Sequence, residues 1–156
     1  MSIDDHTMTT QPSYSVTVRR EFIAQHFLVG GDWGRENQLN SHRYRVEARY
    51  EGTSLDRHGY LLDIAEVEAR LNGLAERYRD RTLNEFHEFD GLNPSVEHFA
   101  RISSEHLVVR APNICALEVT VWEDDHAGAG YRQVFGPELE QGSEQRNHVR
   151  HEEGTS

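Results

Sequence analysis

The alternating segment from residue 40 to residue 51 constrains the fold more than any other part of this sequence. Its even positions run Asn40, His42 and then apolar or aromatic residues, while its odd positions are mostly charged. A period of two with one wet face predicts an antiparallel strand that is packed on one side only. His42 therefore points inward near the start of the strand, where a purely structural strand would carry a hydrophobic residue.

A second alternating segment lies upstream, from Tyr14 to Leu28, and also has one apolar face. His26 falls on that face, whereas Arg20 interrupts it and predicts a β-bulge. Two inward histidines on neighbouring strands can share a metal, because imidazole is a common zinc ligand. A hydrogen-bonded core histidine is the alternative for either His26 or His42, and their spacing alone leaves both interpretations open.

The late part of the chain predicts two more strands. Odd positions from Cys115 to Val121 are apolar, and the same inward face ends in Glu123. Residues 127–130 predict a turn, and residues 131–135 predict a short fourth strand. A buried carboxylate is costly unless it is paired. Glu123 is therefore either a strand-end residue that has reached solvent or an anchor for the guanidine-like edge of a ligand.

Two amphipathic helices separate these pairs of strands. The first is predicted to start after the N-capping residue Asp63. The second is predicted to start at the capping residue Asn93, which is followed by a proline at the first helical position. The order ββααββ predicts an α+β fold, with the two helices on one face of a four-stranded antiparallel sheet.

Composition limits where the chain works and what it binds. The net charge of −11 argues against a nucleic-acid backbone as the main partner. There is neither a membrane-length apolar run nor a signal-peptide pattern, so we expect a cytoplasmic protein that makes no membrane contact. A single cysteine excludes an intrachain disulfide and a cysteine-based zinc motif. We expect one domain at residues 13–136, between a flexible lead at 1–12 and a disordered acidic tail at 137–156.

Five segments, in this order and spacing, resemble the 6-pyruvoyl tetrahydropterin synthase and 6-carboxytetrahydropterin synthase family. They are Phe22–Leu28, Asn40–Tyr44, Gly59–Asp63, Leu83-Asn84 with Asn93–Glu97, and Val119–Glu123. The resemblance implies the tunnelling fold, in which sheets join between subunits around a barrel, usually in a homohexamer built from two trimers. It also implies a pterin-like ring bound between subunits, a zinc ion held by three histidines, and elimination of triphosphate from 7,8-dihydroneopterin triphosphate.

The resemblance assigns roles residue by residue. Glu123 matches the pterin anchor, with Ser95 and Glu97 near the same ring. His26 and His42 match two of the three zinc-binding histidines. The remaining zinc-binding histidine falls on Asn40, and a neutral amide is a poor zinc ligand.

The catalytic positions also depart from the family pattern. Glu36 stands where the family has its catalytic cysteine. The family's Asp-His pair falls on Arg79 and Asp80, or with a one-residue gap on Asp80 and Arg81, so at most the aspartate is kept.

Two functions are consistent with these departures. The first is a pterin-binding homologue with altered or lost synthase activity, in which the ring pocket with Glu123 survives. The alternative is an active zinc-dependent carbon–oxygen lyase in which Glu36 replaces the cysteine as general base. In that enzyme His26, His42 and either Asn40 or Glu36 would hold the zinc. A purely structural assembly protein is a third class, against which an inward Glu123 argues.

Overall fold

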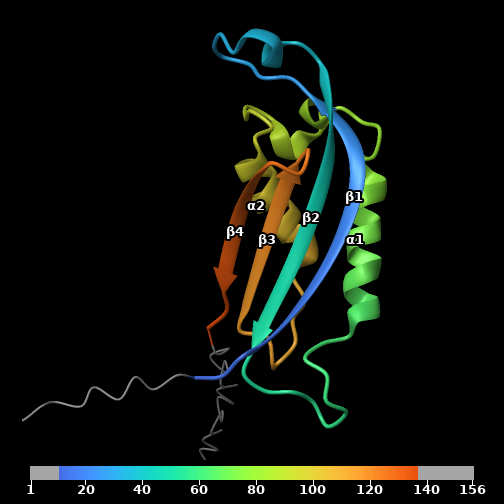
Figure 1. Ribbon diagram of the computed structural model, residues 1–156, viewed down its shortest axis with the longest axis vertical. Helices are drawn as coiled ribbons and strands as arrows, with labels where there is room; N and C mark the ends of the chain where they lie inside the picture. Colours follow the sequence, from blue (N-terminus) through green and yellow to red (C-terminus); the bar gives the residue numbers. More distant parts are fainter. Residues whose placement is uncertain (1–10, 137–156) are drawn as a thin grey trace, which may run out of the picture.

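The computed structural model describes residues 11–136 and has one antiparallel sheet with two α-helices on one of its faces (Figure 1). The strands lie side by side in chain order: β1 (Tyr14–His26), β2 (Asn40–Gly52), β3 (Ala116–Glu123) and β4 (Ala127–Val134). The helices between β2 and β3 are α1 (Ile64–Tyr78) and α2 (Val96–Leu107). Three short 3-10 helices complete the described elements: η1 (Gly34–Asn37), η2 (Leu83–Glu85) and η3 (His87–Phe89).

This arrangement confirms the predicted α+β fold and its ββααββ order. The predicted flexible lead lies outside the described residues except for positions 11 and 12, and the predicted tail at 137–156 lies outside them entirely. Neither α-helix of the described part has the length and apolar character that crossing a bilayer requires.

The inward faces of the sheet and the helices form one hydrophobic core. Alternation places every second residue of β2 and β3 in it, and the apolar stripe of each helix covers that face. Its fully buried members include Val46, Ala48, Tyr50, Val67, Leu71, Phe99, Leu117, Val119 and Val121.

The register of β1 against β2 is regular, and the predicted bulge at Arg20 is wrong. Arg20 pairs with Val46 without an extra residue, and His26 at the end of β1 pairs with Asn40. The arginine needs no bulge because its guanidinium reaches α1, where Nε donates to the side-chain oxygen of Asn72 at 2.7 Å.

The helix starts differ in how well the sequence predicted them. Asp63 caps α1 by accepting a hydrogen bond from the amide of Ala65, as expected. The predicted start of the second helix at Asn93 is wrong, because Ser95 is the N-cap of α2. Asn93 instead bonds both backbone groups of Val29 in the loop after β1, at 2.8 and 3.2 Å.

The predicted turn at residues 127–130 is also wrong. These residues begin β4, and the chain reverses at Asp124 and Asp125, whose φ angles are 50° and 65°. Gly128 lies opposite Trp122, and a Cβ added there would be 2.8 Å from the indole ring. The glycine therefore allows close packing of the ring within the sheet rather than a turn.

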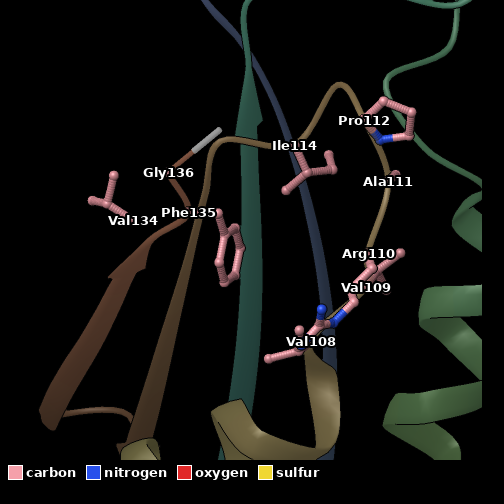
Figure 2. Close-up of a pocket in the computed structure, with 9 residues that line it drawn as sticks. All are labelled: Val108, Val109, Arg110, Ala111, Pro112, Ile114, Val134, Phe135 and Gly136. Atoms are coloured by element: carbon pink, nitrogen blue, oxygen red, sulfur yellow. The ribbon is translucent and has the colours of Figure 1, made fainter. Parts of the chain in front are cut away.

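A hollow of about 650 Å³ lies between the segment that follows α2 and the end of β4 (Figure 2). Its lining is mostly apolar and includes Val109, Ile114 and Phe135. It lies far from His42, because β4 finishes beside Ala116, which pairs with the last part of β2 rather than its beginning. The lining contains no imidazole or carboxylate, so the predicted metal and ligand site does not lie in this hollow.

Candidate functional site

The two predicted histidines meet where β1 ends and β2 begins. The ring centroids of His26 and His42 are 4.9 Å apart, with the rings almost perpendicular. Glu123 at the end of β3 joins them, because its Oε1 lies 3.0 Å from Nε2 of His42. One ligand atom from each of these three residues lies within 4.8 Å of the other two. Two imidazoles and a carboxylate from three different strands thus lie close together.

Each histidine is oriented through its Nδ1 atom. Nδ1 of His26 lies 3.0 Å from the carbonyl oxygen of Pro94. A carbonyl only accepts, so this nitrogen carries a proton and Nε2 is the ring nitrogen left to face the site. Nδ1 of His42 bonds the carboxylate of Asp124, which favours the same tautomer. Both rings therefore present Nε2, the atom that a metal would bind.

Four buried polar atoms around these rings have no hydrogen-bond partner among the described residues. They are His26 Nε2, Asn40 Oδ1, His42 Nε2 and the hydroxyl of Tyr44. The 3.0 Å contact between His42 and Glu123 is an ion-pair distance, but its angles are not those of a hydrogen bond. Buried polar groups nearly always have partners, so such a cluster indicates a place built for a ligand or metal.

The electrostatics of the site favour a cation. Glu36 brings a third carboxylate, with Oε2 at 3.7 Å from Nε2 of His26, beside those of Glu123 and Asp124. Burial, and then the charges of these carboxylates, raise the pKa of Tyr44 far above its ordinary value, so its phenol stays neutral. Partial burial would raise the pKa of Asp124, but hydrogen bonds from His42 and a backbone amide outweigh it and lower this pKa.

Backbone contacts in the loop between β1 and β2 hold Glu36 over the strand ends. The amide of Leu28 donates to the Glu36 carbonyl at 2.7 Å, which closes the neck of the loop. The side chain of Asn37 donates to the carbonyls of Leu28 and Gly31 at 3.1 and 3.0 Å. The Glu36 side chain remains 46% exposed, so it faces both His26 and solvent. A group in this position can exchange protons with a bound molecule.

Asn40 is adjacent to the histidines but its amide nitrogen is already engaged. It donates to the carbonyls of His26 at 3.2 Å and Gln38 at 2.9 Å. This leaves only the side-chain oxygen, which has no hydrogen-bond partner, to face the site.

The other predicted residues do not join the histidines within one chain. The Ser95 hydroxyl caps α2 and Glu97 is exposed in the first helical turn. Asp80 has a φ of 57°, and its amide donates to the carbonyl of Ile23 at 2.7 Å along the outer edge of β1. Ile23 precedes His26 by three residues, which is about 10 Å along a strand.

Sequence reasoning missed Asp124 and Pro94. Strict alternation places Asp124 on the outward face because it follows Glu123, but its left-handed backbone turns the side chain back to His42. Two aspartates after a strand are a hairpin-turn signal that could have revealed this. Pro94 acts through its carbonyl, which no pattern of residue types reveals.

Comparison with known proteins gives a consistent set of similarities. The family model described as 6-pyruvoyl tetrahydropterin synthase matches residues 15–134. No curated protein sequence matches the chain. The Caenorhabditis elegans 6-pyruvoyl tetrahydropterin synthase structure is 18% identical with a TM-score of 0.67, covering 81% of this chain and 99% of that one.

Two Plasmodium structures are also similar. The P. falciparum synthase is 15% identical with a TM-score of 0.65, covering 79% of this chain and 99% of that one. A P. vivax synthase, in which a glutamate described as a catalytic residue is replaced by cysteine, is 15% identical with a TM-score of 0.62. It covers 80% of this chain and 99% of its own.

Proposed function

The chain belongs to the 6-pyruvoyl tetrahydropterin synthase family and has its tunnelling fold, and we propose that it is a zinc-dependent carbon–oxygen lyase acting on a dihydropterin such as 7,8-dihydroneopterin triphosphate. The observation that carries this proposal is the pair of buried Nε2 atoms of His26 and His42, neither of which has a hydrogen-bond partner among the described residues, with the Glu36 carboxylate beside His26.

The donor set fits zinc. Two histidines and a glutamate form a known catalytic zinc set that leaves a position open for substrate. His26 and His42 would bind through Nε2, and Oε1 of Glu123 is the nearest carboxylate oxygen. When bound, zinc would polarise an oxygen of the substrate side chain. The second oxygen of Glu123 would accept from the guanidine-like edge of the ring, the role that the family resemblance implies.

Glu36 would act as the general base. Its carboxylate is exposed enough to meet a substrate and lies 3.7 Å from Nε2 of His26, so it can take a proton from the substrate side chain beside the metal. The similar P. vivax synthase has a glutamate described as catalytic, which supports a carboxylate in this role. Tyr44 would stay protonated and serve only as a hydrogen-bond donor.

A second candidate is a pterin-binding homologue without synthase turnover. It is favoured by Asn40 in place of a third histidine and by the position of Asp80 away from His26. In this protein the ring would still bind to Glu123, with Ser95 and Glu97 nearby.

The assembly is inferred from the family. We expect a homohexamer of two trimers with the ring bound between subunits, because β4 and the part of β1 before Ile23 are sheet edges and edge strands offer unpaired backbone groups. The cytoplasmic location remains a prediction.

One set of purified proteins separates the two functions. Zinc per subunit, pterin binding by calorimetry and turnover of 7,8-dihydroneopterin triphosphate are measured on the same sample. We expect stoichiometric zinc that is lost in His26→Ala and kept in His58→Ala, an exposed control histidine. Glu36→Gln should keep zinc and lose turnover. Pterin binding without turnover in the unaltered chain would favour the second candidate, and absence of both zinc and pterin binding would refute both.

A further inference from the structure

We propose that Asp124 is a positioning residue of the metal site, which fixes the ring orientation and the tautomer of His42. This inference rests on the proposed metal-binding function. It concerns Asp124 in the turn between β3 and β4. The family resemblance assigns a role to Glu123, the residue before it, but none to Asp124.

The side chain of Asp124 is tied to β2 by both of its oxygens. Oδ2 bonds Nδ1 of His42, and Oδ1 accepts from the amide of Arg43 at 2.9 Å. The amide of Asp124 also donates to the carbonyl of Arg43 at 3.0 Å. Three contacts with two consecutive residues of β2 fix the carboxylate, so the histidine ring is held by a rigid partner.

The backbone conformation of the turn makes this contact available. Glu123 and Asp124 are neighbours in the chain, yet they reach opposite nitrogens of the same imidazole: Glu123 lies at Nε2 and Asp124 at Nδ1. In an extended strand, consecutive side chains would point to opposite faces of the sheet. The φ of 50° at Asp124 breaks that alternation. Such a conformation is uncommon for residues other than glycine and is best tolerated by asparagine and aspartate.

The chemistry of the two ring partners differs. His26 donates to the neutral carbonyl of Pro94, whereas His42 donates to an ionised carboxylate. A carboxylate behind a ligating histidine fixes the tautomer and raises the basicity of the metal-binding nitrogen. His42 should therefore be the stronger ligand of the pair. This matters in a chain where an asparagine, Asn40, occupies the position of the family's remaining histidine.

Asp124→Asn and Asp125→Asn form a matched pair of variants. Both residues have positive φ, which asparagine tolerates, but Asp125 bonds Arg43 and Arg45 rather than histidine. We expect Asp124→Asn to weaken zinc binding by roughly 10–100-fold in a chelator competition, the usual effect of losing such a partner. Asp125→Asn should bind zinc like the unaltered chain.

A second readout does not depend on metal binding. In metal-free protein labelled with nitrogen-15 histidine, NMR should show His42 protonated at Nδ1 in the unaltered chain. Asp124→Asn should shift it towards protonation at Nε2, with His26 unchanged. An unchanged His42 tautomer, or equal loss of zinc in both variants, would overturn the inference. If the unaltered chain binds no zinc but the tautomer still shifts, the positioning role stands and the proposed metal function fails.

Discussion

Two tyrosines on β2 allow a matched test of whether the polar atoms near the histidines exist for a ligand. Tyr44 and Tyr50 both point into the core and are 1% and 0% exposed. The Tyr50 hydroxyl donates to the carbonyl of Leu107 at 2.6 Å. The Tyr44 hydroxyl has no partner among the described residues. The same deletion, tyrosine to phenylalanine, should therefore change the free energy of unfolding in opposite directions.

The magnitudes follow from the cost of a buried unsatisfied group, which is about 1–3 kcal/mol. Tyr44→Phe removes such a group and should stabilise the metal-free protein by about 1–2 kcal/mol. Tyr50→Phe leaves the Leu107 carbonyl without its partner and should destabilise the protein by about 1–3 kcal/mol. The two variants should thus differ by at least about 2 kcal/mol, or roughly 4–8 °C in Tm for a chain of this size.

The assay is urea unfolding in the presence of a chelator, followed by far-ultraviolet circular dichroism. All samples must have the same protomer concentration, because assembly makes apparent stability depend on concentration. If Tyr44→Phe destabilises the protein as much as Tyr50→Phe, the Tyr44 hydroxyl is satisfied without a ligand. The unpartnered atoms near the histidines would then not indicate a ligand site.

Three further predictions concern acid stability, packing and catalysis. Burial alone would raise the pKa of Glu88, but hydrogen bonds from Tyr78 and an arginine outweigh it and lower this pKa. The contribution of Glu88 to stability is therefore present above the ordinary glutamate pKa of about 4.3 and is lost as pH falls through the lower folded value. Glu88→Gln should reduce the fall in Tm between neutral and acidic pH in thermal melts. An unchanged dependence of Tm on pH would contradict this prediction. Gly52→Ala should destabilise the chain and make it more susceptible to limited proteolysis, because the added Cβ would lie 2.0 Å from the carbonyl oxygen of Asn113. If the variant resists the protease as well as the unaltered chain does, that packing would be contradicted. Asp80→Asn tolerates the same positive φ, and because Asp80 bonds Ile23 away from His26 it should keep both turnover and stability; lowered turnover at unchanged stability would instead make Asp80 catalytic.

The sequence could predict that His26, His42 and Glu123 share one end of one face, because alternation decides the face and antiparallel pairing decides the end. The structure brings these three residues together as expected. The same reasoning could not locate Asp124, because a single left-handed residue reverses the direction in which alternation sends a side chain.

Other errors have equally local causes. Asn93 and Ser95 are both good helix caps, and only the bonds from Asn93 to Val29 across the fold decide between them. Gly128 is a good turn residue by composition, but the ring of Trp122 needs the space that its missing side chain leaves. In the first case a tertiary contact overrides a local preference, and in the second a cross-strand contact within the hairpin does so.

The packing of Trp122 within the sheet also gives the chain an optical reporter. Its indole lies one residue before Glu123, with the Arg45 guanidinium 5.5 Å from the ring centroid. The only other tryptophan is Trp33, which is 43% exposed in the loop that carries Glu36. Trp33→Phe would leave a single indole on the face of the sheet opposite Glu123, next to Arg45, which bonds Asp125 in the turn after Glu123. Because indole emission depends on nearby charge and water, its fluorescence would then report rearrangement of that turn in unlabelled protein.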